Sequence, residues 1–277
     1  MGYLISPITQ AIILIVIIIT VMGYYYYSTS NTIESFGNPI HFDQTVVINL
    51  DKETHRYNNI RNQCKLARLH FAKFRATDGK KLNINNLKQK GVLKLQKDSF
   101  FNHNKYGRSS LSGSIGCALT HQAIWKKISK SQKNTLILED DIILPKDFQQ
   151  KFDKYSSQIP GDWDIIFLGG VRIYGSYVST NVIKAKQTKS NKWNNCGLYS
   201  YILNPRSARK LLAYTTPLTN YLDIQMNRHY NRLKVYYLVP TIIKHNFKLP
   251  STRNLLKGSK YYYSKGFINS SKKITVA

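Results

Sequence analysis

Short apolar runs alternate with amphipathic stretches between residues 44 and 240, and this alternation predicts an α/β fold. Six runs are brief, apolar or β-branched, and bounded by polar or turn residues, as buried strands are: 45–50, 71–76, 135–138, 163–170, 197–203 and 235–239. Helical spacing of apolar positions predicts a helix over 61–69, and Pro205 marks the first turn of another over 206–212. This order of strands and helices is typical of an open, nucleotide-binding sheet.

Two stretches lack a clear hydrophobic period. Residues 80–110 are rich in Lys and Asn, and we expect a mobile insertion there. Residues 171–195 are expected to be irregular.

The N-terminus carries an uncharged run from Ile8 to Tyr27, about as long as the roughly 20 residues that cross a bilayer. Tyr24–Tyr27 resemble an interfacial aromatic belt. The run therefore predicts a transmembrane helix, as an uncleaved single-pass anchor over residues 1–27, with the folded part outside the cell or in a lumen. The alternative is a cleaved signal peptide, but a charged n-region and a small-x-small site are missing.

The rest of the chain divides by composition. A stem is expected over 28–43, a single folded domain over 44–250, and a basic, Tyr-rich tail over 251–277. The chain has 41 Lys and Arg against 14 Asp and Glu, a formal charge of +27. Such a charge calls for a nucleic acid, an anionic membrane surface or phosphate-bearing small molecules as partner. The cysteines have no metal-ligand spacing, and we expect buried free thiols at Cys64, Cys117 and Cys196.

Three adjacent carboxylates, Glu139, Asp140 and Asp141, follow the predicted strand 135–138. Alternation along the strand places Glu139 and Asp141 on one side and Asp140 on the other. Oxygen ligands at the carboxyl end of a buried strand suit a hard divalent cation. The alternative is a solvated acidic turn before Pro145.

Three further polar residues are candidates for a site. Asp78 ends the second predicted strand, although an Asp-Gly pair is also an ordinary turn. His121 follows small residues on a predicted helix, where a lone histidine is usually a satisfied core residue. Asp223 is the last acidic residue of the chain, and the alternative for it is a helix N-cap or surface turn.

Five blocks in order make the chain resemble glycosyltransferase family 25, which includes lipooligosaccharide and procollagen galactosyltransferases. The blocks are Val47–Asp51 with Arg56, Ala76–Gly79, Leu111–Trp125, Leu136–Asp141 and Trp163–Gly169. Gly197–Leu212 fits a later helix of the family, so the resemblance covers roughly residues 45–247. The family usually has Ser where Thr120 precedes His121, and the stretches 80–110 and 171–195 do not match, so acceptor choice is expected there.

The resemblance implies a GT-A-type α/β sheet flanked by helices, a nucleotide-sugar donor and inversion at the anomeric carbon. We expect Mn²⁺ or Mg²⁺ to stabilise the leaving diphosphate, with Asp141 as principal ligand and Glu139 as ligand or ribose contact. Six residues are expected to bind the donor or shape its site: Asn49, Arg56 on phosphate, Asp78 on base or ribose, His121, Glu139, and Asp140 as a loop-fixing residue.

Inversion also requires a base on the acceptor hydroxyl, and Asp223 is the candidate. The expected partners are a nucleotide sugar, a glycan or hydroxylated protein acceptor and a membrane, with no specific nucleic acid. The alternatives are a basic nucleic-acid-binding protein and an inactive glycan-binding relative.

Overall fold

The computed structural model describes residues 6–30, 40–95, 99, 108–188, 194–249 and 275–276. The chain divides into two compact units, Met1–Gly37 and Asn38–Ala277. The predicted stem 28–43 and the predicted tail 251–277 lie largely outside the described residues.

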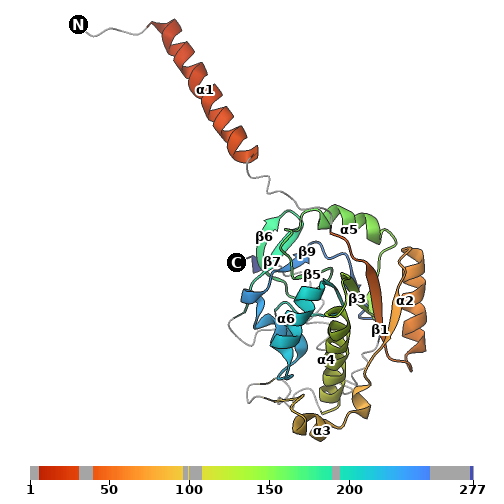
Figure 1. Ribbon diagram of the computed structural model, residues 1–277. Helices are drawn as coiled ribbons and strands as arrows, with labels where there is room; N and C mark the ends of the chain where they lie inside the picture. The colour runs from red at the N-terminus through yellow and green to blue at the C-terminus, as the bar shows by residue number, and fades with distance from the viewer. Residues whose placement is uncertain are drawn as a thin grey trace. The chain divides into compact units, whose positions relative to one another are not determined.

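The second unit alternates strands with helices, as the hydrophobic pattern predicts (Figure 1). Its α-helices are α2 Thr54–Leu66, α3 Ile84–Gln89, α4 Arg108–Ile128, α5 Phe148–Ser156, α6 Pro205–Thr215 and α7 Leu222–Asn227. Its strands are β1 Gln44–Asn49, β2 Ala72–Arg75, β3 Thr135–Glu139, β4 Ile142–Ile143, β5 Ile165–Phe167, β6 Tyr174–Ser179, β7 Val182–Ala185, β8 Ser200–Leu203, β9 Val235–Leu238, β10 Lys244–His245 and β11 Thr275–Val276. All six predicted strands are confirmed, with ends that differ by a few residues.

The main sheet is mixed, in the order β11-β6-β7-β9-β5-β8-β3-β1-β2. β1 runs parallel to both β2 and β3, whereas β8 runs antiparallel to β3 and β5. β4 and β10 form a separate antiparallel pair. The parallel pairing of β1 with β3 brings their carboxyl ends to one edge of the sheet, where polar residues follow both strands.

The sheet has a hydrophobic core on each face, and β3 shows why. Ile137 belongs to one core together with residues of α4, α6 and α7, whereas Leu136 and Leu138 belong to the other core with residues of α2 and α5. Because successive side chains of a strand point to opposite faces, a strand covered on both faces must be apolar throughout. The second unit therefore folds as three layers, helices–sheet–helices.

The expectation for one of the two weakly periodic stretches is wrong. Residues 80–110, where a mobile insertion is expected, contain α3, which Asn83 caps by accepting a hydrogen bond from the Asn86 N–H, and the mobility of this stretch stays a prediction. Residues 171–195, expected to be irregular, contain the hairpin β6–β7, paired from Gly175↔Ala185 to Ser179↔Val182 with a register shift after Tyr177. Short strands that are interrupted by an irregularity give a weak period-2 pattern of apolar residues. The register shift in β6 therefore explains why the sequence pattern did not predict the hairpin.

In the first unit, the described residues form one helix, α1 Pro7–Ser30. Within the part of the chain that the structure describes, no helix meets the combination of length and hydropathy that crossing a membrane requires. The predicted transmembrane element therefore has no support from the described residues.

The segment after β2 touches the start of α4 at two glycines. A Cβ on Gly79 would lie 2.0 Å from the Ser112 carbonyl oxygen, and one on Gly116 would lie 2.7 Å from the Thr77 oxygen. Since backbone atoms cannot move aside cheaply, we expect Gly79→Ala to lower the free energy of unfolding by at least about 2 kcal/mol. The matched control is Gly161→Ala, because a Cβ there meets nothing within 4 Å. Urea denaturation of both variants checks this, and equal stabilities would contradict it.

An ion pair of the buried Asp164 connects α6 to the amino-terminal end of β5. Asp164 is 1% exposed and accepts hydrogen bonds from Ser207 Oγ at 2.7 Å, Lys210 Nζ at 2.8 Å and the Lys234 N–H at 3.0 Å. Burial opposes ionisation of Asp164, but these hydrogen bonds outweigh it and lower its pKa. The ionised carboxylate therefore stabilises the fold above the unfolded-state pKa of about 3.9, and this stabilisation is lost as pH falls through the lowered folded-state pKa.

Asp164→Asn should accordingly lower the free energy of unfolding at pH 7 by about 2–3 kcal/mol, the loss expected for hydrogen bonds to a charged group. The difference between parent and variant should begin to shrink below about pH 4 and shrink further as the pH falls through the lowered folded-state pKa of Asp164, where that carboxyl becomes neutral. Denaturant melts across pH check this. A pH-independent difference would contradict the ionic account.

Candidate active site at the carboxyl ends of β1 and β3

The three adjacent carboxylates lie where β3 ends, beside the end of β1, with Ile48 paired to Glu139. Asp140 is buried, whereas Glu139 and Asp141 are partly exposed. The alternation predicted for the three side chains is therefore confirmed. Glu139 and Asp141 are the two that a ligand can reach.

Asp140 is held inside the protein by two partners. Asn49 Nδ2 donates to Asp140 Oδ2 at 2.6 Å, and the Arg56 guanidinium lies 2.6 Å from Oδ1. The pKa of Asp140 is raised to about 7, chiefly by burial and also by the charges of Asp141 and Glu139, although Arg56 and Asn49 act in the opposite direction. This geometry gives Asp140 the loop-fixing role expected for it, with Asn49 as part of the same framework.

Arg56 is 5% exposed and also forms an ion pair with Asp141. The guanidinium thus bridges two of the three carboxylates from the first turn of α2. Arg56 was expected to contact phosphate. In the structure its guanidinium instead forms ion pairs with Asp140 and Asp141. The protein's own cation offsets much of the repulsion in the triplet, so that repulsion alone does not require a metal.

Glu139 is positioned by a buried hydrogen-bonded chain. Trp125 Nε1, which can only donate, lies 2.8 Å from the Tyr201 hydroxyl, and that hydroxyl lies 2.8 Å from His121 Nδ1. His121 Nε2 lies 3.2 Å from Glu139 Oε1. The tautomer that satisfies every group has Tyr201 donating to Nδ1 and Nε2–H donating to Glu139.

His121 is 0% exposed, so it orients Glu139 from beneath and presents no surface of its own to a donor. His121 was expected to bind the donor, but its buried side chain does not lie on a surface that a donor contacts. The i, i+4 spacing places Trp125 on the same face of α4 as His121. Strand β8 adds Tyr201, which the sequence did not indicate.

Asp141 has a second neighbour, the imidazole of His245, that the sequence did not indicate. His245 Nε2 lies 3.4 Å from Asp141 Oδ2, and the His245 ring meets the Tyr199 ring edge-on at 5.7 Å. The pairing of β10 with β4 places His245 opposite Ile142, the residue after Asp141. Nothing in the sequence pattern links positions so far apart.

Asp78 stands at the end of the neighbouring strand β2. Its carboxylate accepts from Lys52 Nζ at 2.7 Å and from the Lys80 N–H at 3.1 Å, capping a short 3₁₀ turn over Gly79–Lys81. The hydrogen bond from Lys52 is the main reason that the pKa of Asp78 is lowered. The side chain remains partly exposed, so both the turn and the ligand-binding readings are compatible with its position.

The departure at Thr120 is structurally mild. Its hydroxyl donates to the Gly116 carbonyl at 2.7 Å and accepts from the Thr77 N–H at 2.9 Å. A serine hydroxyl can make both bonds, so the link between α4 and the Asp78 loop does not depend on the extra methyl group.

Asp223 lies in the first turn of α7. Its Oδ1 accepts from the Ile224 N–H at 2.9 Å, and its Oδ2 from the Gly197 N–H at 3.4 Å. Burial, and then the charge of the neighbouring Asp223, raise the pKa of the Cys196 thiol. The contacts anchor the start of α7 to the Gly197 loop. The N-cap of α7 is Tyr221, so Asp223 is not the helix N-cap considered as its alternative role.

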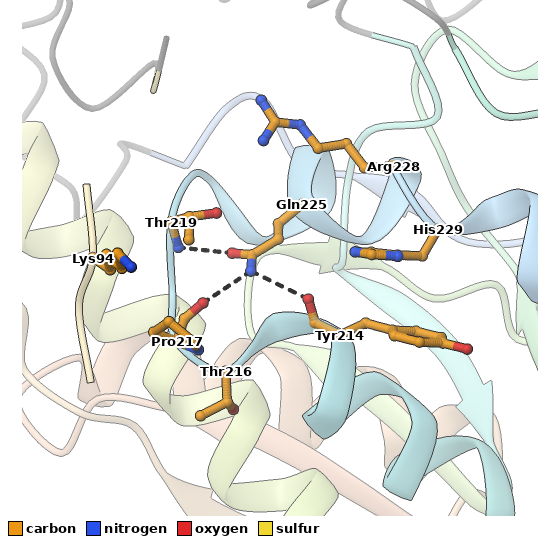
Figure 2. A pocket seen from close by; sticks show the side chains of 8 residues that line it. All are labelled: Lys94, Tyr214, Thr216, Pro217, Thr219, Gln225, Arg228 and His229. Carbon is orange, nitrogen blue, oxygen red and sulfur yellow. Dashed lines mark hydrogen bonds between the residues drawn. The ribbon is translucent and has the colours of Figure 1, made fainter. Parts of the chain in front are cut away.

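A cavity of about 340 Å³ lies elsewhere, between the end of α6 and α7. Figure 2 shows the side chains that line it. The Gln225 amide oxygen accepts a hydrogen bond from the Thr219 N–H, and its Nε2 donates to the carbonyl oxygens of Tyr214 and Pro217. Its described lining contains cationic or imidazole side chains, at Lys94, Arg228 and His229, and no carboxylate. This cavity is thus unsuited to a divalent cation and includes none of the residues predicted to bind donor or metal.

Glu139 and Asp141 fit a hard divalent cation. Both offer carboxylate oxygens from one side of the strand end, and Mg²⁺ or Mn²⁺ sites commonly combine one or two carboxylates with phosphate oxygens of the substrate. The Arg56 guanidinium offsets part of the charge of Asp141, which suits a site completed by an anionic diphosphate.

The chain is similar in sequence to known glycosyltransferases. The chain is 24% identical to human procollagen galactosyltransferase 2 over 211 residues, covering 72% of this chain and 33% of the relative. It is 28% identical to a glycosyltransferase 25 family member of Aedes aegypti over 193 residues, covering 67% and 31%. The chain therefore spans about a third of the length of these curated relatives.

Among solved structures, a glycosyltransferase involved in the glycosylation of the major capsid of PBCV-1 overlaps 84% of this chain and 81% of its own. The identity is 8% and the TM-score 0.29, too low to carry an argument about the fold.

The model of glycosyltransferase family 25 (LPS biosynthesis protein) matches residues 42–226, from the residues before β1 to α7. This range is well over half of the chain and contains Asn49, Arg56, the acidic triplet and Asp223. The chain therefore belongs to glycosyltransferase family 25.

Proposed function

We propose that the protein transfers a hexose, galactose or glucose, from a nucleoside-diphosphate sugar to a glycan or hydroxylated protein acceptor, with inversion and with Mn²⁺ or Mg²⁺ bound. The observation that carries this is the pair Glu139 and Asp141, partly exposed at the end of β3 and held by buried partners in a family 25 chain. A GT-A-type arrangement of the mixed sheet is part of the same proposal.

The roles follow from the contacts. Glu139 and Asp141 would hold the cation, which when bound offsets the charge that gathers on the leaving diphosphate. Asn49, Arg56 and Asp140 keep the triplet rigid, and His121 orients Glu139. Preorganised charge of this kind needs no rearrangement during the reaction. Asp78 is placed at the neighbouring strand end for the base or ribose.

Asp223 is proposed as the base that removes the proton from the acceptor hydroxyl. It is the last carboxylate of the chain and lies within the matched family region. Its two backbone hydrogen bonds fix its orientation and do not exclude this role, because each carboxylate oxygen can accept more than one bond.

The test is release of free nucleoside diphosphate from a panel of nucleotide sugars, with Mn²⁺, with Mg²⁺ and after chelation. We expect release from one hexose donor that stops on chelation and returns with the metal. Absence of turnover with every donor and acceptor would contradict the enzyme reading and favour an inactive glycan-binding relative. Sequence-selective DNA binding at physiological salt would favour the nucleic-acid alternative.

Membrane attachment through residues 1–27, with the catalytic unit outside the cell or in a lumen, stays a prediction that rests on the uncharged run from Ile8 to Tyr27. The full chain should sediment with membranes and resist carbonate extraction, whereas a chain shortened to begin at Ser28 should not sediment. Full-length protein in the supernatant would contradict the anchor.

A further inference from the structure

Cys117, His121 and Glu139 converge on one point beside the carboxylate pair. Cys117 and His121 are four residues apart on α4 and so share one helix face, which looks onto the end of β3. A ligand atom from each of the three lies within 4.8 Å of the other two. We propose that these three side chains form a binding site for a soft divalent cation such as Zn²⁺, distinct from the hard-cation site of Glu139 and Asp141.

The distances fit tetrahedral coordination. Metal–ligand lengths near 2.0–2.3 Å place tetrahedral O and N ligands roughly 3.3 Å apart, and O and S ligands roughly 3.5 Å apart. His121 Nε2 lies 3.2 Å from Glu139 Oε1, and Cys117 Sγ lies 3.9 Å from the same oxygen. The thiol has to approach Glu139 Oε1 by about 0.4 Å to meet these values, and the three ligand atoms already lie within 4.8 Å of one another.

The groups behind the site prepare His121 for a metal. A ligating imidazole usually donates its other N–H to a fixed acceptor, which orients the ring. Tyr201 Oη lies 2.8 Å from His121 Nδ1 and has two lone pairs, one for Trp125 Nε1–H and one for Nδ1–H. Metal binding therefore needs a change of tautomer, in which His121 frees Nε2 and donates from Nδ1, together with loss of the Cys117 thiol proton to solvent.

The donor set selects the ion. Thiolate and imidazole prefer Zn²⁺ or Co²⁺ to Mg²⁺ or Mn²⁺, whereas Glu139 and Asp141 offer oxygen only. Cys117 and Glu139 are partly exposed, so a cation can enter. On the proposed function, a soft ion would draw Glu139 away from the donor's metal, and zinc would inhibit transfer.

The test uses the reduced, metal-free full chain and Co²⁺, without any nucleotide. We expect one equivalent of Co²⁺ to produce a thiolate-to-cobalt charge-transfer band and intense tetrahedral d–d bands. Zn²⁺ should displace the cobalt, and an equal concentration of Mn²⁺ should not. A parent protein without the charge-transfer band would overturn the proposal.

Two variants assign the ligands. Cys117→Ser should lose the band and bind cobalt more weakly by over about 100-fold, beyond the 10–100-fold that outer-shell changes cost. Cys64→Ala is the matched control, since Cys64 is a free thiol in the core of α2, and it should keep the band. A band that survives in Cys117→Ser would refute the site.

Glu139→Gln should keep the charge-transfer band but weaken cobalt binding, and unchanged binding would exclude Glu139 as a ligand. Circular dichroism confirms that each variant is folded, with Cys117→Ala as a second variant if the serine disturbs α4. Because the spectra need neither donor nor turnover, they stand or fall separately from the nucleotide-release assay.

Discussion

Asp141→Asn should reduce sugar transfer by about 10³-fold or more while leaving the protein folded. The substitution keeps the shape of the side chain and removes the charge that would hold the donor's metal. Its effects on stability oppose each other, because repulsion from Asp140 and Glu139 is relieved while the ion pairs with Arg56 and His245 are lost. We therefore expect a small change in melting temperature and a large loss of turnover.

Thermal melts with Mn²⁺, with nucleoside diphosphate and with both together check the assignment. Metal and nucleotide together should raise the melting temperature of the parent and not that of Asp141→Asn. Asp147→Asn is the matched control, since Asp147 is an exposed carboxylate 3.0 Å from Lys151 and away from the site. If the pair of ligands stabilises Asp141→Asn as much as the parent, the metal site is elsewhere.

Asp223→Asn should lower turnover by about 10²–10⁴-fold with donor affinity nearly unchanged, as expected for loss of a general base. The amide oxygen can still accept from the Ile224 N–H, so the start of α7 should hold. The measurement is kcat alongside nucleotide-sugar affinity.

A structural role for Asp223 would give a different result. Asp223 anchors the Gly197 loop, where the backbone has φ of +99°. A purely structural Asp223 would give a less stable Asn variant that still turns over, and the base would then have to be another group. Asp153→Asn is the control, since the exposed Asp153 carboxylate accepts its described hydrogen bond from a surface side chain, that of Gln149.

The site could be located from the sequence because local rules govern its parts. The apolar run before Glu139 predicts a strand buried on both faces, and strand alternation separates Asp140 from its two neighbours. The i, i+4 spacing of Cys117 and His121, and of His121 and Trp125, places all three along one side of α4. The hairpin β6–β7 and the helix α3 were missed because short or irregular elements carry little periodic signal.

What surrounds each carboxylate was decided by the tertiary structure alone. Arg56 reaches the triplet because β1 and β3 are parallel neighbours, Tyr201 reaches His121 because β8 pairs with β3, and His245 reaches Asp141 because β10 pairs with β4. Residues expected on the donor, Asn49, Arg56 and His121, became buried supports for this reason. Sequence pattern determines which face of its own element a side chain occupies, whereas the order of strands in the sheet determines which charges and hydrogen-bond donors meet it.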